Sequence, residues 1–469
     1  MFASKVYIER RQALRSRMKG GLVLMLGNGY SPINYEGNPY RFRQDSSFLY
    51  YFGLDAANLV GLLDLDGGKD YLFGDEYTMD DIIWMGDQAS LVSRAEQVGI
   101  QCVRPLAELK DELDSAVRHG RKVHYLPPYR AEQVLQLHEL LGLTPEGVRN
   151  YVSHQLVEAV IAQRSVKSAE EIAELDAIHE VGYKMHVAAM RGAQPGASEQ
   201  VLTGELEGIA VGYGYMTSFN TILSQHGERL HNEAHDGILE KGRLLLVDCG
   251  AESQLHYASD NTRVSPVGGA FSQQQLAVYE TVLRGVNKGV ELARPGVKYV
   301  DVHMAVCRVL TEGLQAIGVM KGNVDESVAN GAHALFLPHG LGHMMGLDTH
   351  DMECYGEDYV GYDTEVQRSA QFGTASLRCG KRLQEGFVVT VEPGIYFIPK
   401  LIEKWHKEKI NNAFINFREL EKYYEFGGIR LEDDIVITAT GCRILGEHRI
   451  PIEPEAVCEE VRKGSAGRA

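Results

Sequence analysis

Residues 244–250 read LLLVDCG, and residues 388–394 read VVTVEPG. Each is an apolar run of strand length that ends in an acidic residue, Asp248 or Glu392, close to a glycine. A carboxylate at the end of a buried strand must be solvated, paired or bound to a metal, because burying an unpaired charge is costly. The two stretches therefore predict β-structure whose strand ends carry functional acids.

A similar pair of helices is predicted before each of these strands. Residues 168–171 (SAEE) and 272–275 (SQQQ) both have the pattern of a helix-initiating capping box. Each first helix is expected to stop before a Pro-Gly pair, at 195–196 and 295–296, and a second helix follows. We predict a duplicated α+β unit whose acids surround one central cleft; the alternative is that two helical hairpins are alike by chance.

The first part of the chain has the pattern of a mixed α/β domain. A polar helix is expected at its start, and short apolar runs between glycines are expected to be strands. The helices are predicted over 5–19 and within 130–163, and the strands within 21–27 (GLVLMLG), 47–54 (SFLYYFGL), 58–74 and 123–126. The pattern changes near 160–166, so we predict domains over 1–163 and 164–462, followed by a flexible tail over 463–469.

Composition narrows the class of function. The net charge is −17, which argues against nucleic acid as the main partner, because phosphate binding needs clustered Lys and Arg. No window has the length and apolarity of a membrane span, and the start of the chain lacks the apolar core of a secretory signal. The 7 cysteines are scattered and none forms a CxxC pair, which favours reduced thiols and a cytoplasmic location.

Further acids and a histidine complete a candidate ligand set. Asp260 lies 12 residues after Asp248, across a stretch long enough for a hairpin that would bring the two carboxylates together. Glu432 precedes another apolar strand, and His343 lies in the glycine-rich run PHGLGHMMG. With Glu392, these are four carboxylates and one imidazole, a set that suits Mn²⁺, Co²⁺, Fe²⁺ or Zn²⁺ and has enough negative charge for two ions.

Such a set predicts hydrolytic chemistry. Two divalent ions about 3.5–4 Å apart can hold a hydroxide between them and polarise a carbonyl group. His231, His339 and His350 would then supply proton transfer and hydrogen bonds to a tetrahedral intermediate. Each residue alone has a more ordinary interpretation, as a turn residue or a structural histidine, and the hypothesis depends on the whole set.

The motifs, in this order, resemble those of aminopeptidase P and prolidase, the proline-directed pita-bread (creatinase/aminopeptidase-like) metallopeptidases. The matching stretches cover nearly the whole chain: FRQDSSFLYYFGL, LLLVDCG, YASDNTR, LPHGLGHMMGLDTHD, VVTVEPGIYF and GGIRLEDDIVIT. The resemblance implies an α/β N-terminal domain followed by an α+β pita-bread catalytic domain with internal pseudo-twofold duplication. It also implies an Xaa-Pro peptidase, in which a metal-activated hydroxide hydrolyses the peptide bond before proline.

The resemblance further implies roles for individual residues. Asp260 and Glu432 would bridge two metal ions, with Mn²⁺ as the family's usual activator. The full set of implied metal ligands is Asp248, Asp260, His343, Glu392 and Glu432. The implied catalytic residues are Glu392, which carries a proton to the proline nitrogen, and His231, His339, His350 and Arg430.

The substrate is expected to be a proline-containing peptide, contacted by His231, His350 and Arg378. Arg378 lies 14 residues before Glu392 and matches an arginine that, in eukaryotic-type prolidases, grips the free carboxylate of the dipeptide's proline. The resemblance thus favours an Xaa-Pro dipeptidase, with an aminopeptidase P acting on longer peptides as the alternative. A non-catalytic pita-bread binding module is a distant alternative, because such modules lose metal ligands. We also expect a homodimer or homotetramer.

Overall fold

The computed structural model of the chain describes residues 1–466. It divides into two units, Met1–Arg164 and Ser165–Ala469. The predicted tail over 463–469 begins inside helix α17 (Pro454–Ala466), and its last three residues lie outside the described part. No helix within residues 1–466 is long and apolar enough to cross a membrane.

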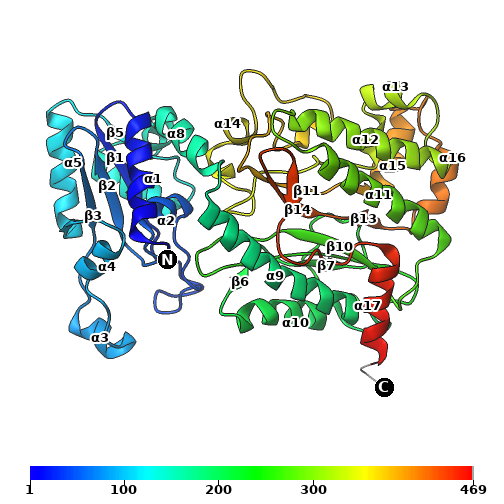
Figure 1. The fold of residues 1–469 in the computed structure, drawn as a ribbon, viewed down its shortest axis with the longest axis horizontal. Helices are drawn as coiled ribbons and strands as arrows, with labels where there is room; N and C mark the ends of the chain where they lie inside the picture. Colours follow the sequence, from blue (N-terminus) through cyan, green and yellow to red (C-terminus); the bar gives the residue numbers. More distant parts are fainter. Residues whose placement is uncertain (467–469) are drawn as a thin grey trace. The chain divides into compact units, whose positions relative to one another are not determined.

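The N-terminal unit is built on a mixed five-stranded sheet in the order β4-β3-β2-β1-β5 (Figure 1). The predicted apolar run at 21–27 forms the buried strand β1, which pairs antiparallel with β2 and parallel with β5. The strands are β1 (Leu22–Leu26), β2 (Val60–Asp64), β3 (Lys69–Phe73), β4 (Cys102–Arg104) and β5 (Val123–His124). The helices are α1 (Ser4–Arg17), α2 (Ser46–Phe52), α3 (Met79–Met85), α4 (Leu91–Gln97), α5 (Leu109–Arg118), α6 (Ala131–Leu141), α7 (Pro145–Asn150) and α8 (His154–Arg164).

The prediction of a strand within 47–54 is wrong, because these residues form helix α2. The Asp45 side chain caps its first turn by accepting a hydrogen bond from the Phe48 amide at 2.8 Å, and Gly53 ends it with φ 64°. All seven residues of the helix are buried. A short run that is buried on every side has no period, so its pattern does not distinguish a helix from a strand.

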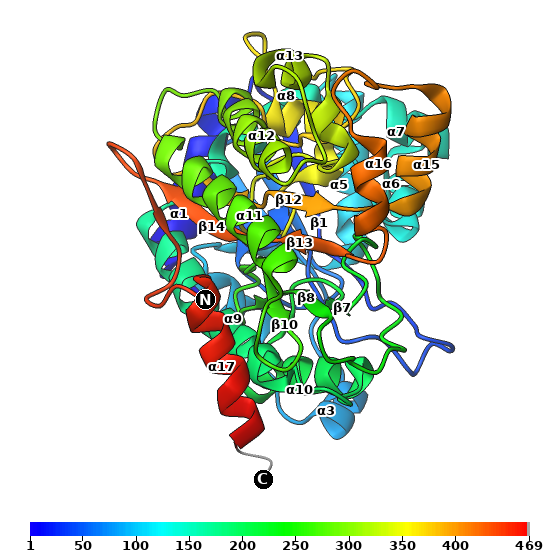
Figure 2. The same ribbon diagram turned by 90° about the vertical axis from the view of Figure 1, so that its right-hand side faces the viewer.

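The second unit contains the predicted pair of similar halves. Both capping boxes form as expected, at the starts of helices α9 (Ala169–Gly192) and α11 (Gln273–Leu292). Each long helix is followed by a Pro-Gly turn and a second helix, α10 (Glu199–Gly212) or α12 (Tyr299–Ala316). The glycines of the two turns, Gly196 and Gly296, have φ values of 84° and 86°. Figure 2 shows α11 and α12 lying side by side.

Antiparallel strands follow each helical pair. The first half supplies a three-stranded sheet in the order β10-β8-β7, and the second half supplies one in the order β11-β14-β15 together with the pair β12-β13. The strands of this unit are β6 (Met216–Thr217), β7 (Ile222–Ser224), β8 (Leu244–Cys249), β9 (Ala251–Glu252), β10 (Asn261–Pro266), β11 (Val388–Val391), β12 (Gly394–Tyr396), β13 (Gly428–Arg430), β14 (Asp433–Ile437) and β15 (Cys442–Ile444).

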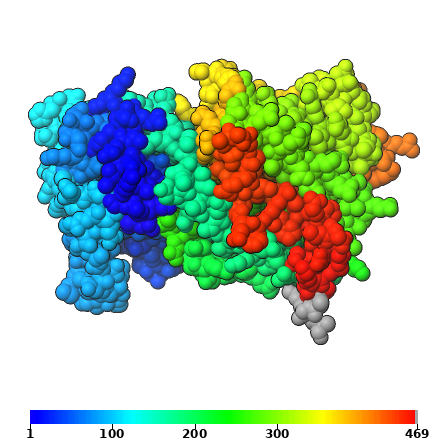
Figure 3. Space-filling view, in the orientation of Figure 1, coloured from blue at the N-terminus to red at the C-terminus, as the bar shows by residue number. Residues whose placement is uncertain are grey.

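Helices enclose these strands. One core cluster joins the inner faces of α9 and α10 to β8 and includes residues of α17, which lies at the surface of this unit (Figure 3). The remaining helices are α13 (Val324–Ala329), α14 (Glu357–Gly361), α15 (Pro399–Glu408) and α16 (Phe417–Leu420), with single 3₁₀ turns at Ala332–Leu335 (η2), Glu353–Tyr355 (η3), Thr374–Ser376 (η4) and Glu421–Tyr423 (η5).

Candidate active site

The first two acids lie on one antiparallel pair of strands. Asp248 is in β8, directly opposite Thr262 of β10, and Asp260 precedes Thr262 by two residues. Because side chains alternate along a strand, Asp260 is on the same side of the pair as Thr262 and Asp248. The hairpin expected from the 12-residue spacing therefore forms, and both carboxylates face one side of it.

The other two acids lie at the junction of two strand pairs. Val391 of β11 is opposite Asp433 of β14, and Gly394 of β12 is opposite Arg430 of β13. This common register places Glu392 opposite Glu432, between the two pairs. The Glu432 amide donates to the Thr262 carbonyl at 3.1 Å, which joins the second half's strands to those of the first.

His343 reaches the acids because its glycine-rich segment runs beside β11. The Glu392 amide donates to the Leu341 carbonyl at 2.8 Å, and the Thr390 amide donates to the His343 carbonyl at 3.1 Å. A Cβ atom on Gly342 would lie 2.1 Å from the Thr390 carbonyl oxygen, so this close approach requires glycine. The approach leaves His343 Nε2 3.4 Å from Asp260 Oδ2 and 3.8 Å from Glu392 Oε1.

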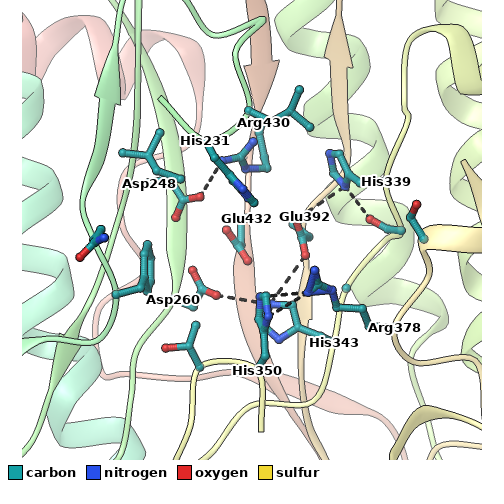
Figure 4. Close-up of a pocket in the computed structure, with 18 of the residues that line it drawn as sticks. His231, Asp248, Asp260, His339, His343, His350, Arg378, Glu392, Arg430 and Glu432 are labelled. Carbon is teal, nitrogen blue, oxygen red and sulfur yellow. Dashed lines mark hydrogen bonds and ion pairs between the residues drawn. The ribbon is translucent and has the colours of Figure 1, made fainter. Parts of the chain in front are cut away.

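All the residues predicted for the site line one cavity of about 620 Å³. Figure 4 shows the four carboxylates converging on its floor, with the histidines and the two arginines around them. The lining includes His231, Asp248, Asp260, His339, His343, His350, Arg378, Glu392, Arg430 and Glu432. Phe219, Ile222 and Leu230 add apolar surface to the same cavity.

Burial and mutual repulsion raise the pKa values of Asp260, Glu392 and Glu432. Burial, opposed by the hydrogen bond to His343 and reinforced by Asp248, raises the pKa of Asp260 to about 7. Burial followed by the charge of Asp260 raises the pKa of Glu432 well above its ordinary value. Burial alone would lower the pKa of His343, but the carboxylates of Asp260 and Glu392 raise it to about 9.

The donor set fits divalent metal ions. Asp260, His343 and Glu432 are all buried, and one ligand atom from each lies within 4.8 Å of the other two. Asp248 Oδ1 is buried and has no hydrogen-bond partner among residues 1–466. An oxygen-rich set with one imidazole and an unsatisfied carboxylate oxygen is the chemistry that Mn²⁺, Co²⁺, Fe²⁺ and Zn²⁺ accept.

Arg430 links the acid cluster to His339. It is buried and donates to Asp248 Oδ2 at 2.5 Å and to the Tyr396 hydroxyl at 2.8 Å, and the same hydroxyl lies 2.8 Å from His339 Nε2. Arginine only donates, so the tyrosine oxygen accepts from it and the hydroxyl proton points to Nε2. The His339 proton is thereby assigned to Nδ1, which donates to the Gly340 carbonyl at 2.7 Å and lies 3.7 Å from Glu392.

His350 and Arg378 form a second polar group in the cavity. Arg378 Nη1 lies 2.8 Å from His350 Nδ1 and 3.3 Å from Glu353 Oε2. Burial, then the neighbouring His343, lowers the pKa of His350 to about 4. The Arg378 side chain is 34% exposed and lines the cavity. His231 also lines the cavity and is exposed.

Several supporting residues were missed by the sequence analysis. Tyr396 holds His339, and Thr262 Oγ1 donates to Glu432 Oε2 at 2.7 Å. Asp434 Oδ2 accepts from the Asp260 amide at 2.9 Å and lies 2.7 Å from His179 Nε2. Asp434 could have been suspected, because an acid at the start of an apolar strand needs a partner. No local signal marks His179, which occupies a helix turn.

The fold and the site define a metallohydrolase with a duplicated α+β catalytic unit. The family described as metallopeptidase family M24 matches residues 173–439, and the aminopeptidase P N-terminal domain matches residues 7–125. The chain belongs to metallopeptidase family M24 and has the pita-bread fold. It carries an aminopeptidase P-type N-terminal domain before the catalytic unit.

Relatives with two different names are equally similar to the chain. A probable Xaa-Pro aminopeptidase of Aspergillus fumigatus is 30% identical over 94% of this chain and 93% of its own length. The Xaa-Pro dipeptidase of Homo sapiens is 30% identical over 93% of this chain and 89% of its own, and the Xaa-Pro aminopeptidase of Escherichia coli is 30% identical over 97% of both.

Solved structures of E. coli aminopeptidase P are also similar. The structure with the inhibitor Pro-Leu has a TM-score of 0.81 and 29% identity, and the comparison covers 99% of both chains. A zinc-substituted form in complex with product has the same TM-score, identity and coverage. These likenesses identify the fold and the family, and they leave the choice between the two activities open.

Proposed function

We propose that this Xaa-Pro peptidase is a dipeptidase that hydrolyses the bond before a C-terminal proline. The observation that carries this proposal is the position of Arg378 in the same cavity as the candidate metal ligands. A cation at a fixed place beyond the acids can recognise a free carboxylate. Among substrates that lose a single residue from before proline, only a dipeptide has a carboxylate directly after that proline. Aminopeptidase activity on longer peptides is the second candidate.

We propose that Asp248, Asp260, His343, Glu392 and Glu432 hold two divalent ions, with Mn²⁺ as the activating metal. When bound, such ions would polarise the scissile carbonyl group and lower the pKa of a water molecule. Stripping the protein with a chelator should abolish peptidase activity, and adding Mn²⁺ should restore it. Undiminished activity in protein that elemental analysis shows to be metal-free would contradict this assignment.

Residues of the chain would handle the protons. Glu392 is placed to accept a proton from the attacking water and deliver it to the proline nitrogen, because its carboxylate faces the cavity between His339 and His343. His339 lies beside this carboxylate at 3.7 Å without a hydrogen bond to it, because its Nδ1 proton is donated to the Gly340 carbonyl. His350 and His231 line the cavity where the carbonyl oxygen would develop charge, and an imidazole N–H from either would stabilise it.

The substrate bond itself restricts recognition. An Xaa-Pro bond has no N–H at the scissile nitrogen, so the enzyme cannot recognise that position by a backbone hydrogen bond. Groups on either side must fix the register, and a carboxylate clamp on the proline side would do so. Cis and trans isomers of the bond exchange slowly, so we expect the site to take one isomer, the trans form.

The competing aminopeptidase function is favoured by one observation. Arg378 is already paired: Glu353 Oε2 lies 3.3 Å from Nη1 and Glu357 Oε1 lies 3.7 Å from Nε. These acids partly neutralise the guanidinium and weaken its attraction for a second carboxylate. If Glu353 and Glu357 keep the Arg378 guanidinium fully engaged, the cavity would accept a neutral amide after proline as readily as a carboxylate.

The test compares three substrates that differ only beyond proline: Ala-Pro, Ala-Pro-amide and Ala-Pro-Ala. For the wild type, kcat/KM should be highest for Ala-Pro. A hydrogen bond to a charged group contributes about 1.5–3 kcal/mol, and the exposure of Arg378 places the effect near the lower end. Arg378→Ala should therefore lower kcat/KM for Ala-Pro roughly tenfold and leave the amide nearly unchanged.

A matched control is Arg382→Ala, four residues further on. Arg382 is also partly exposed and ion-paired, through Glu365, but it does not line the cavity. This variant should leave all three rates near wild type. A wild-type preference for Ala-Pro-Ala, or an equal loss on all three substrates in Arg378→Ala, would reject the dipeptidase proposal and favour the aminopeptidase.

We also propose that the chain assembles at least as a dimer. Helix α3, which projects from the N-terminal unit in Figures 1 and 3, has no buried residue. Its Trp84 is 86% exposed and Ile83 is 68% exposed, which is typical of a contact surface. Light scattering should give a multiple of 52.1 kDa, and a single-chain mass at all concentrations would refute the assembly.

A cytoplasmic location is proposed from the seven free cysteines.

A further inference from the structure

A second group of potential metal ligands lies outside the acid cluster. His303 and Cys307 are one helical turn apart on the buried face of α12, and His333 is in the η2 turn. One ligand atom from each lies within 4.8 Å of the other two. Relative exposures are 0% for His303, 0% for Cys307 and 1% for His333, so the group is sealed from solvent.

One imidazole of this group has no hydrogen-bond partner among the described residues. Neither ring nitrogen of His333 has a hydrogen-bond partner among residues 1–466. The His303 ring contacts only the Cys307 sulfur among hydrogen-bonding groups of the same residues, at 3.6 Å from Nε2 and 4.0 Å from Nδ1. Buried polar side chains nearly always have partners, so an imidazole with neither nitrogen satisfied requires an explanation. One nitrogen of this His333 ring lies within 4.8 Å of the ligand atoms of His303 and Cys307.

The imidazoles are in the protonation state that metal binding requires. Burial, together with the nearby His333, lowers the pKa of His303 to about 3. Burial lowers the pKa of His333 to about 4. Both rings are therefore neutral near pH 7, and each has one nitrogen lone pair to offer. The Cys307 thiol would lose its proton to the solvent when it binds a metal.

The spacing fits tetrahedral coordination. With Zn–S about 2.3 Å and Zn–N about 2.0–2.1 Å, two ligand atoms on a tetrahedral ion lie about 3.6 Å apart. Cys307 Sγ and His303 Nε2 are separated by 3.6 Å. Because the His333 nitrogen lies within 4.8 Å of the other two ligand atoms, it needs an approach of at most about an ångström, which a small change in its side-chain torsions can supply. We propose that His303, Cys307 and His333 supply three of the four ligands of a buried zinc site, separate from the catalytic metal set.

The ligand types distinguish this site from the catalytic one. A thiolate with two imidazoles selects Zn²⁺ over Mn²⁺, whereas the carboxylate-rich set accepts harder ions. The ion would tether α12 to η2, and η2 leads into the segment that carries His339 and His343. At the end of that turn, the Tyr396 amide donates to the Phe336 carbonyl with a separation of 2.9 Å. The tether would therefore also support β12, whose Tyr396 hydroxyl contacts His339.

Cobalt substitution tests the site by a signal that the catalytic set cannot give. The full-length protein would be produced in zinc-depleted medium with Co²⁺, so that a buried site is filled as the chain folds. Thiolate bound to Co²⁺ gives a near-ultraviolet charge-transfer band, and the catalytic set contains no cysteine. The wild type should show this band, and elemental analysis of zinc-grown protein should find about one zinc atom per chain that survives stripping of the catalytic metals.

Variants assign the band. Cys307→Ser should abolish it and remove about one zinc atom per chain, while Cys458→Ser, at a buried thiol outside the cluster, should keep both. His333→Gln should weaken zinc retention while the Cys307 thiol stays in place. This variant tests the site independently if Cys307→Ser does not fold. Absence of the band from fully loaded wild type, or its survival in folded Cys307→Ser, would overturn the proposal and leave a cluster that holds water or nothing.

Discussion

The buried ion pair between Lys167 and Asp351 should be a sensitive electrostatic contact of the catalytic unit. Lys167 Nζ lies 3.0 Å from Asp351 Oδ2, and each side chain is 1% exposed. At this separation two unit charges attract by about 5–6 kcal/mol at an effective dielectric constant of about 20. Desolvation offsets much of that attraction in the intact pair, but removal of one partner leaves the other charge buried and uncompensated.

Lys167→Met should therefore lower the free energy of unfolding by about 3–5 kcal/mol. For a unit of this size that corresponds to a drop in Tm of roughly 5–8 °C. The double variant Lys167→Met with Asp351→Asn should recover part of the loss, because no charge remains buried. Urea denaturation followed by circular dichroism measures the wild type, Lys167→Met, Asp351→Asn and the double variant, and the coupling follows from the double-mutant cycle.

The exposed pair of Lys400 and Glu403 provides the control. These side chains are 89% and 52% exposed at 2.9 Å, so Lys400→Met should leave the stability indistinguishable from that of the wild type. Lys167→Met should also lower kcat, since Asp351 directly follows His350 and its amide donates to the Met344 carbonyl at 2.9 Å. A Lys167→Met protein within about 0.5 kcal/mol of wild type would refute the reasoning.

Three further outcomes are expected. Arg430→Lys should weaken metal binding and activity about 10–100-fold, measured by metal titration, because lysine cannot hold Asp248 and the tyrosine hydroxyl together. Glu392→Gln, when metal-replete, should lower kcat by about 10²–10⁴; a near-wild-type rate would exclude its role in proton transfer. Burial alone would raise the pKa of Asp176, but Arg443 and a backbone amide lower it overall. Asp176→Asn should therefore cost under about 1 kcal/mol of stability at pH 7, and the difference should vanish as the pH falls below the unfolded value of about 3.9 and through the lower folded value.

Much of the catalytic unit could be predicted because its signals are local. A capping box is a four-residue pattern, and both predicted boxes form. The apolar runs before Asp248 and Glu392 are long enough to be recognised as strands, and each is broken by a single acidic residue. These signals fix the order of helices and strands, and the hairpin between Asp248 and Asp260 follows from the length of chain between them.

The supporting contacts could not be predicted, because they depend on register between distant strands. Tyr396 reaches His339 across 57 residues and Arg430 reaches Asp248 across 182. Either contact would be lost if β12 and β13 paired one residue out of step, since a slip turns every side chain to the other face. The wrong strand prediction within 47–54 has a different cause. These residues are buried on all sides, so their sequence lacks the hydrophobic period that distinguishes a helix from a strand.

Ligands of the catalytic site can be recognised in the sequence, whereas those of the proposed zinc site cannot. The difference lies in the positions that the polar residues occupy among the apolar ones. Asp248 and Glu392 lie at the ends of apolar strands, so each breaks a hydrophobic run at a visible point. His303 and Cys307 instead occupy the apolar face of α12, among Val302, Val306 and Leu310, where a histidine and a cysteine look like ordinary core residues. Only the arrival of His333 from another element gives the pair a third ligand, and its two unpartnered nitrogens are visible only once the core is built.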